Sequence, residues 1–319
     1  MNSSAEPIND ASDGLDGWDV RHLAAVLAVA EERSFSRAAA RLGYTQSAVS
    51  QQIGALERRL GVTVFDRAAG PRRVELTQAG QVLVRHARAV VSELRMAGEN
   101  VKAVRDGKLG TVRVGTVQSV GTKVLPQVIE RFHAAHPRVD IQLTESCEYS
   151  LLADAVRRGE LDVSFVASSG DASLEVIPLF ADPYVFMCAA SSPFAGRDQV
   201  GLTEVAELPL VGFRNVDCQN DLLRVLPRAR FVFQSDDNGT VQGCIAAGVG
   251  FGLVPLLTVD ATHPGTVVIP VAPPAPVREL AVVADPKRTR SRAIEDFIAL
   301  SQDVARGLGT QQWCSGVPR

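Results

Sequence analysis

The segment SFSRAAARLGYTQSAVSQQIGALERRLGVTVFDR, residues 34–67, constrains the fold most, because its spacing predicts two short helices joined by a tight turn. Ala38 and Leu42 lie on one face of the first helix, where a small residue lets two helices cross closely. Gly43 follows at the point where the turn needs a residue that tolerates a positive φ. The Thr45 hydroxyl can then cap the second helix. This pattern is typical of a helix-turn-helix.

The second of these helices has one apolar and one polar face. Its apolar residues recur at helical spacing: Val49, Ile53, Leu56 and Leu60. The opposite face carries amides and hydroxyls without charge, which suits contacts with base edges in a major groove. From the two helices we expect the following residues to contact DNA: Arg37, Thr45, Gln46, Ser47, Ser50 and Gln51. The alternative is an ordinary helical hairpin with a polar outer face.

A short hairpin is expected after the second helix. An apolar run at 62–65 is followed by Gly70 and Pro71, and the chain then returns as a strand at 74–76. Residues 18–77 carry nine basic and six acidic side chains, whereas the whole chain has a net charge of −3. Positive charge is therefore concentrated where DNA binding is expected. Three arginines are placed to bind phosphates or enter a minor groove: Arg67, Arg72 and Arg73.

Residues 34–67, continued by LTQAG at 76–80, closely resemble the LysR-type transcriptional regulators. The resemblance implies an α+β multi-domain fold: a winged helix-turn-helix, a long linker helix, and a two-lobed α/β effector-binding domain similar to type II periplasmic binding proteins. It implies operator DNA, a small-molecule effector and further copies of the chain, as homodimer or homotetramer, as partners. RNA polymerase is a further candidate partner.

Three positions depart from the family pattern. Many members carry proline where this chain has Ser47, and arginine is frequent where it has Gln51. A basic or larger residue is common at the position of Gly54, and glycine there costs a helix about 1 kcal/mol relative to alanine. The glutamine removes one charged contact with DNA.

A long helix is expected after the hairpin, from Thr77 onward. A run of about 25–30 helical residues with an apolar seam suits a coiled-coil-like contact between two copies of the chain. The alternative is one more core helix of the following domain. The seam consists of Val82, Leu83, His86, Val90, Val91, Leu94 and Val101.

The rest of the chain alternates strands and helices. Expected strands at 111–116, 139–144 and 161–167, with helices between them, predict a parallel sheet with right-handed crossovers. The chain then builds a second α/β unit and returns, which makes two lobes with a ligand-binding cleft between them. The expected divisions are an N-terminal extension (1–17), the DNA-binding domain (18–76), the linker helix and hinge (77–110), lobe I (111–168 and 267–305), lobe II (169–266) and a C-terminal tail (306–319).

Four polar segments are expected to converge on that cleft, near residues 118, 147, 214 and 238. The first begins a helix, where backbone N–H groups and the Ser119 hydroxyl favour an anion. By resemblance this loop holds a carboxylate or similar group, and plain helix capping is the alternative. The expected effector-binding residues are Gln118, Ser119, Val120, Cys147, Phe213, Cys218, Asn238 and Thr240.

Cys218 lies in the region where the peroxide-sensing branch of this family keeps a reactive cysteine. That branch uses a second cysteine a few residues further on, but none occurs here between Cys218 and Cys244. The five cysteines show no CxxC spacing, which makes reduced thiols the default. A thiol-based redox-sensing regulator acting through Cys218 is the alternative function.

Other classes of function lack their sequence signals. The chain contains no GxSxG, Walker A, HExxH or Rossmann glycine pattern, so we expect no enzyme, no metal and no cofactor. The polar, acidic N-terminus has no signal-peptide pattern, and the uncharged stretch at 244–259 is too short to span a bilayer. A cytoplasmic protein is therefore expected, and a solute-binding protein is disfavoured.

Overall fold

The structure is a computed structural model. It divides into two compact units, residues up to 99 and residues from 100 onward, and each is described by itself. The division falls within the segment 77–110 that the sequence assigns to a linker. The residues described are 19–66, 74–105, 110–167, 173–214, 216–272 and 276–314.

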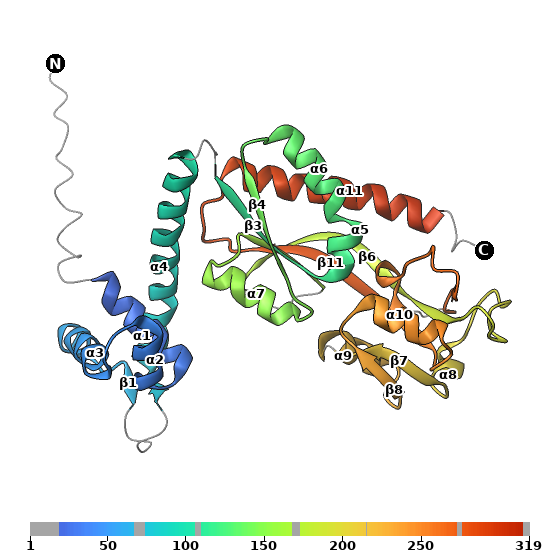
Figure 1. Ribbon diagram of the computed structural model, residues 1–319, viewed down its shortest axis with the longest axis horizontal. Helices are drawn as coiled ribbons and strands as arrows, with labels where there is room; N and C mark the ends of the chain where they lie inside the picture. The colour runs from blue at the N-terminus through green and yellow to red at the C-terminus, as the bar shows by residue number, and fades with distance from the viewer. Residues whose placement is uncertain are drawn as a thin grey trace. The chain divides into compact units, whose positions relative to one another are not determined.

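Three helices form the first part of unit 1 (Figure 1): α1 (Val20–Glu32), α2 (Phe35–Leu42) and α3 (Gln46–Leu60). Each begins at a side chain that accepts a hydrogen bond from a first-turn N–H, on Asp19, Ser34 and Thr45 respectively. The turn between α2 and α3 uses Gly43 at φ 70°, as the sequence predicts. The two-helix prediction is therefore confirmed.

The predicted apolar stripe of α3 forms the centre of the unit 1 core. Val49, Ile53 and Leu56 are almost completely buried, and Leu60 packs against them. They meet the small face of α2, where Ala38 is fully buried, and the apolar side of α1. Because the polar face of α3 takes no part in this core, it remains available for DNA.

A two-stranded antiparallel wing follows, made of β1 (Phe65–Asp66) and β2 (Glu75–Leu76). The Glu57 carboxylate on α3 accepts hydrogen bonds from the backbone N–H groups of Val64 and Phe65, at 2.7 and 3.3 Å, and so fixes the wing to the helix. A Cβ on Gly80 would lie 2.1 Å from the Val64 carbonyl oxygen, so this glycine is sterically required. The predicted phosphate contacts Arg67, Arg72 and Arg73 lie outside the described residues.

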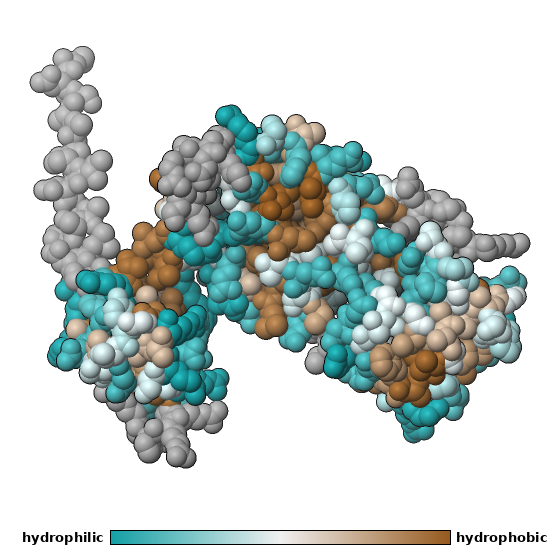
Figure 2. Space-filling model, viewed as in Figure 1, coloured by the Kyte–Doolittle hydropathy of each residue, from teal (hydrophilic) through white to brown (hydrophobic). Residues whose placement is uncertain are grey.

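The long helix predicted after the wing is confirmed as α4 (Gln78–Arg105). Its predicted seam does not act as one surface, however, because Leu83 and Val91 pack on the core of unit 1. The apolar side chains left exposed on α4 are Val82, Val90, Leu94 and Val101. Figure 2 shows hydrophobic surface along this helix.

Lobe I of unit 2 is a mixed sheet covered by helices on both faces. The predicted parallel pairing is confirmed, with β3 between β4 and β5, and β11 adds to β5 in the antiparallel sense. Helices α6 and α11 pack side by side on one face of the sheet and α7 covers the other (Figure 1). The elements are β3 (Thr111–Thr116), α5 (Gln118–Lys123), α6 (Leu125–Ala135), β4 (Asp140–Glu145), α7 (Tyr149–Arg158), β5 (Val163–Ala167), β11 (Val277–Ala284) and α11 (Arg292–Cys314).

Lobe II is built between these elements in the sequence. Its strands β7 and β8 pair in parallel, and β7 lies beside β9. Strands β9 and β10 pair with the second half of β6. Two apolar clusters fill the lobe. The elements are β6 (Glu175–Ala189), α8 (Leu202–Val205), β7 (Pro209–Phe213), α9 (Val216–Val225), β8 (Arg230–Ser235), α10 (Asn238–Ala246), β9 (Gly252–Pro255), η1 (Leu256–Thr258) and β10 (Thr266–Ile269).

The two lobes share β6 (Figure 1). The sequence predicts two separate segments at 176–179 and 184–189, but β6 is one strand of 15 residues. Its first half pairs with β11 in lobe I, and its second half pairs with β9 and β10 in lobe II. Within the pairing of β6 and β11, Arg278 lies directly opposite Asp182. Both charged residues therefore lie where the strands connect the lobes.

Candidate functional site

The face of α3 that points away from the core carries the predicted base contacts. Gln46, Ser47 and Gln51 are exposed, and Ser50 is half-buried. The Thr45 hydroxyl caps the helix through Ala48 N–H and lies 3.0 Å from the Ser47 hydroxyl, so Thr45 also has a structural role. The geometry suits base contacts in a major groove, and contact with DNA stays a prediction for each of these residues.

The basic residues of α2 are engaged within unit 1. Arg37 pairs with Glu32 at 3.5 Å, and Arg41 lies 2.6 Å from the Glu31 carboxylate. Part of their charge is therefore balanced by α1 rather than directed at a phosphate. Tyr44, in the turn before α3, is half exposed and offers an aromatic ring with a hydroxyl beside the predicted base contacts. The sequence interpretation missed Tyr44.

A cavity of about 440 Å³ lies between the two lobes of unit 2. Its walls come from the loops that follow β3 and β4 in lobe I and from the ends of β7 and β8 in lobe II. The lining residues are Val117, Gln118, Ser119, Glu145, Ser146, Cys147, Tyr149, Phe213, Arg214, Ser235, Asp236, Asp237, Asn238, Thr258 and Arg278. This volume suits a small organic molecule.

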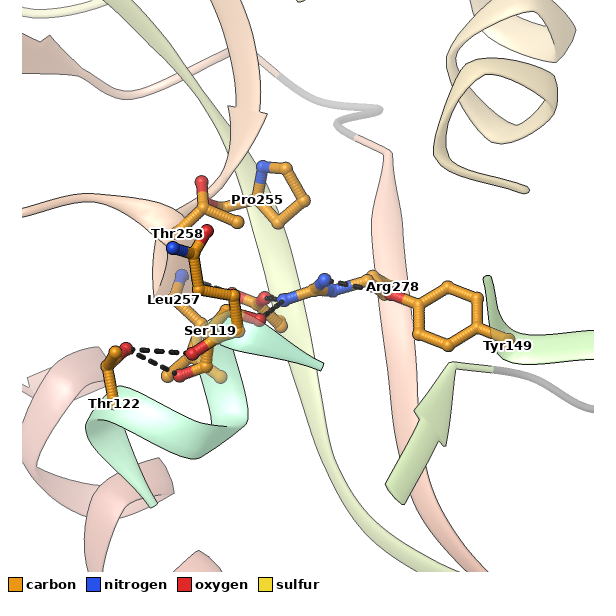
Figure 3. A network of polar contacts seen from close by, with 9 residues as sticks. Ser119, Thr122, Tyr149, Pro255, Leu257, Thr258 and Arg278 are labelled. Carbon is orange, nitrogen blue, oxygen red and sulfur yellow. Dashed lines mark hydrogen bonds and ion pairs between the residues drawn. The ribbon is translucent and has the colours of Figure 1, made fainter. Parts of the chain in front are cut away.

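Arg278 lines the floor of the cavity, with only 3% of its surface exposed. Figure 3 shows its guanidinium between Ser119 and Tyr149. It donates to the Tyr149 hydroxyl at 3.0 Å and to the Ser119 hydroxyl at 3.2 Å. It also donates to Asp182 through Nε and Nη2, at 3.1 and 2.6 Å. Arg278 therefore organises the cavity floor, and its charge is balanced by a buried carboxylate.

Asp182 is buried and does not belong to the cavity lining. It also accepts a hydrogen bond from Leu257 N–H at 3.0 Å, which attaches η1 to β6. Burial raises the pKa of the Asp182 carboxyl, and the adjacent Arg278 charge acts in the opposite direction. Removal of either partner would leave a buried charge uncompensated.

Gln118 connects the lobes directly at the cavity. Its side-chain amide donates to the Asp237 carboxylate at 2.8 Å, and its amide oxygen accepts from Asn238 N–H at 2.8 Å. Asp237 also caps α10 through Thr240. The hydrogen bonds from Gln118 and Thr240 lower the pKa of Asp237. These bonds form a small interlobe latch, defined by Gln118, Asp237 and Asn238.

The remaining charges of the cavity are predominantly negative. Arg214 pairs with Asp236 at 3.2 Å but is 70% exposed. Glu145 faces the cavity from the end of β4. Burial, and after it the charge of Asp236, raises the pKa of the Cys147 thiol. The Cys147 thiol therefore loses its proton less readily than an ordinary cysteine.

The structure brings together five of the eight expected effector-binding residues in the cavity lining: Gln118, Ser119, Cys147, Phe213 and Asn238. Val120 was expected with them, but it is buried in the lobe I core because the α5 helix turns its side chain away from the cavity. Thr240 also lies outside the lining, since both its N–H and its hydroxyl bond to Asp237. The side chain of Cys218, on α9, is outside the description.

The sequence interpretation missed Arg278, Tyr149 and Asp182. A signal for one of them was present, because Asp182 interrupts an otherwise apolar strand pattern. A charge in such a run is expected to be paired. Among the described residues no group of three His, Cys, Asp or Glu side chains could hold a metal ion. Within the same residues no helix has the length and hydropathy needed to cross a membrane.

Two family models match the chain. One, described as "Bacterial regulatory helix-turn-helix protein, lysR family", matches residues 20–81. The other, described as "LysR substrate binding domain", matches residues 105–306. The first match covers the helix-turn-helix and wing, and the second covers both lobes with the cavity between them.

Individual relatives give the same result. A "Hydrogen peroxide-inducible genes activator" of Pectobacterium carotovorum subsp. carotovorum is 31% identical over 297 residues, which cover 88% of this chain and 95% of that protein. A full-length OxyR variant from Pseudomonas aeruginosa superposes with a TM-score of 0.63 at 26% identity, covering 90% of this chain and 96% of that one. CbnR, solved in complex with its target DNA, has the same fold, with a TM-score of 0.59 at 19% identity over 90% of this chain and 99% of that one.

Proposed function

The chain belongs to the LysR family of bacterial helix-turn-helix transcription regulators, and from that premise we propose that a small molecule bound in the interlobe cavity controls how it engages operator DNA. The α3 face would read bases, with the wing arginines on phosphates or in a minor groove. We assign the protein no catalytic activity and place it in the cytoplasm, where its DNA target lies.

The observation that carries this proposal is the composition of the cavity wall. Both lobes contribute polar side chains to it, and Gln118 already bonds across the opening to Asp237 and Asn238. A ligand that bridges the same walls would contact the closed and open arrangements of the lobes differently. Only such a difference in contacts lets a ligand shift a conformational equilibrium.

Pairing of two chains through α4 is part of the same proposal. The exposed Val90 and Leu94 lie four residues apart, and the exposed Val82 lies eight residues before Val90. These three side chains form an apolar row. A second copy that covered this row would remove apolar surface from water. Two recognition helices would then reach half-sites one helical turn, or a multiple, apart on one face of the duplex.

The test uses the full chain and a random DNA library. Repeated selection should enrich one sequence, and footprinting on that sequence should change when a protein-free metabolite extract of the host cell is added. Cys147→Trp, which fills the cavity, should keep the footprint but lose its response to the extract. Ser150→Trp, an exposed neighbour outside the lining, is the matched control. No enriched sequence, or an equal response of Cys147→Trp, would contradict the proposal.

Peroxide sensing through Cys218 is the second candidate function. Two observations favour it. The 31% identical relative is named a hydrogen peroxide-inducible genes activator. Cys218 also lies in the first turn of α9, and a helix N-terminus lowers a thiol pKa. The Cys218 thiolate would attack one peroxide oxygen, and cleavage of the O–O bond would leave a sulfenic acid and a hydroxide, which takes up the proton released by the thiol to give water.

Mass spectrometry of peroxide-treated full-length protein tests this candidate. One added oxygen, or a disulfide, should appear on the Cys218 peptide at lower peroxide than on Cys244, which serves as the internal reference. A Cys218→Ser variant should then lose any peroxide-dependent change in footprint and keep its response to the extract. Oxidation of Cys244 before Cys218 would rule the candidate out.

A further inference from the structure

The interlobe cavity carries more negative than positive charge. Three carboxylates line it, on Glu145, Asp236 and Asp237, against two guanidiniums, on Arg214 and Arg278. The loop at Ser119 was expected to favour an anion, by its backbone N–H groups and its hydroxyl. The lining charges therefore oppose the sequence expectation and decide which sign of ligand can enter.

Neither guanidinium is well placed to hold an anion. Arg278 donates to Asp182, Tyr149 and Ser119, and the buried Asp182 carboxylate balances its charge. Arg214 is largely exposed at the cavity mouth and already pairs with Asp236. A ligand carboxylate on the floor would therefore meet paired positive charge and unpaired negative charge.

Two of the three acidic groups can still accept hydrogen bonds from a ligand. Glu145 forms no ion pair within the described part of the chain, although it faces the cavity. Asp236 bonds to Arg214 through one oxygen, and its other oxygen, Oδ1, is buried without a hydrogen-bond partner. A buried acceptor without a donor is unfavourable, so a donor that reached it on lobe movement would be stabilised. Asp237 is different, because it is already bonded to Gln118 and Thr240.

On the basis of the proposed function, we propose that the effector carries a protonated nitrogen and that Glu145 and Asp236 bind this nitrogen from opposite sides of the cleft. These two groups belong to different lobes, so one cationic nitrogen between them favours closure. The Ser119 oxygen accepts from Arg278, which leaves the hydroxyl hydrogen to donate to a second, oxygen-bearing part of the ligand. The class is a small amine with a hydrogen-bond acceptor at its other end.

Calorimetry with two four-carbon probes of opposite charge tests the sign. 4-Aminobutan-1-ol and 4-hydroxybutanoate have similar length, carry the same hydroxyl oxygen at one end and both fit a cavity of about 440 Å³. At neutral pH and moderate salt, the amino alcohol should bind the full-length protein at least about tenfold more tightly than the hydroxy acid. Equal binding, tighter binding of the hydroxy acid, or no binding of either probe would overturn the proposal.

Charge-neutral variants locate the preference. Glu145→Gln combined with Asp236→Asn should reduce the ratio of the two affinities by about tenfold or more, whereas Glu207→Gln, an exposed acid outside the lining, should leave it unchanged. If the double variant unfolds, the exposed Glu145→Gln alone should still reduce the ratio. If the ratio of the two probe affinities is unchanged in these variants, charges elsewhere in the chain determine it, and the proposal is wrong.

The operator footprint separates this result from the proposed function. A reversed probe preference in a protein that keeps a specific footprint and its response to the extract overturns the amine assignment alone. If the unmodified protein gives no specific footprint, the proposed function itself is overturned.

Discussion

Arg33 ends α1 in the left-handed backbone region, at φ 48°, and is the one non-glycine residue with positive φ among the described residues. A Cβ in this region costs roughly 1–2 kcal/mol, and glycine avoids that cost but adds freedom to the unfolded chain. We therefore expect Arg33→Gly to stabilise unit 1 by about 0.5–1 kcal/mol net. Denaturant unfolding of the full chain measures it, with the exposed Arg59→Gly on α3 as a destabilising control. A lower midpoint for Arg33→Gly would show that its side chain stabilises the turn.

Gln46 is the first residue of α3 and is exposed on the face predicted to read bases. Loss of its amide should reduce discrimination at one base position by roughly 1–3 kcal/mol without weakening binding to every sequence. Competition binding with single-base operator variants measures this. Gln81→Ala, the same change at an exposed position on α4, should leave every base preference unaltered. An unchanged preference in Gln46→Ala would remove this residue from the base contacts.

At the scale of the element, α4 changes partners along its length. Its first turns pack on the DNA-binding unit through Leu83, Val84 and Ala87, whereas Leu94 is 50% exposed. The change follows from position along the helix, because residues 83, 90 and 94 are seven and eleven residues apart and so lie on the same side of a helix with 3.6 residues per turn. Both interpretations offered by the sequence, a core helix and a dimer contact, therefore apply to successive parts of one helix.

Leu94→Asp tests the exposed face. A charge in a paired apolar seam should shift the protein from dimer towards monomer, because the carboxylate would be desolvated on association. Sedimentation velocity measures the change. Leu151→Asp, on a leucine of α7 with a similar exposure of 51%, is the matched control and should leave the association state unaltered. An intact dimer in the Leu94→Asp protein would place the interface elsewhere.

At the scale of unit 2, the interlobe latch makes the lobes sensitive to acid. The hydrogen bond from Gln118 lowers the pKa of Asp237 below its ordinary value of 3.8. A carboxyl whose folded pKa is lowered stabilises the folded form above its unfolded pKa. That contribution is lost as the pH falls through the lowered value. The latch should therefore persist at neutral pH and weaken only below pH 3.8.

Removal of the latch by Gln118→Ala should raise the pKa of Asp237 towards its ordinary value, while the bonds from Thr240 keep it somewhat low. It should also increase hydrogen exchange in the first turn of α10, where Asn238 N–H loses its acceptor. Carboxyl NMR titration and exchange mass spectrometry measure the two effects. The exposed Gln142→Ala on β4 is the matched control. Unchanged exchange at Asn238 would mean that the lobes are held by other contacts.

The sequence by itself determined the features that depend on short-range periodicity. The caps at Ser34 and Thr45, the turn at Gly43 and the stripe of Val49, Ile53 and Leu56 are all set within a few residues. The strand and helix order of the lobes was predictable for the same reason, with boundaries that shifted by several residues. Five of the eight expected effector residues reached the cavity because each lies at or just after the end of a strand, where α/β sheets bind ligands.

Tertiary structure alone decided what those residues contact. Asp182 and Arg278 are 96 positions apart, and only the pairing of β6 with β11 places them opposite each other. Asp182 balances the buried charge of Arg278 on the cavity floor. The Arg278 guanidinium also donates to the Ser119 hydroxyl oxygen, which is then no longer free to accept from a ligand. Gln118 and Asp237, 119 positions apart, meet only because the lobes face each other. The charge of a site is a sum over such distant neighbours, so local sequence pattern predicted the position of the cavity but not the sign of its ligand.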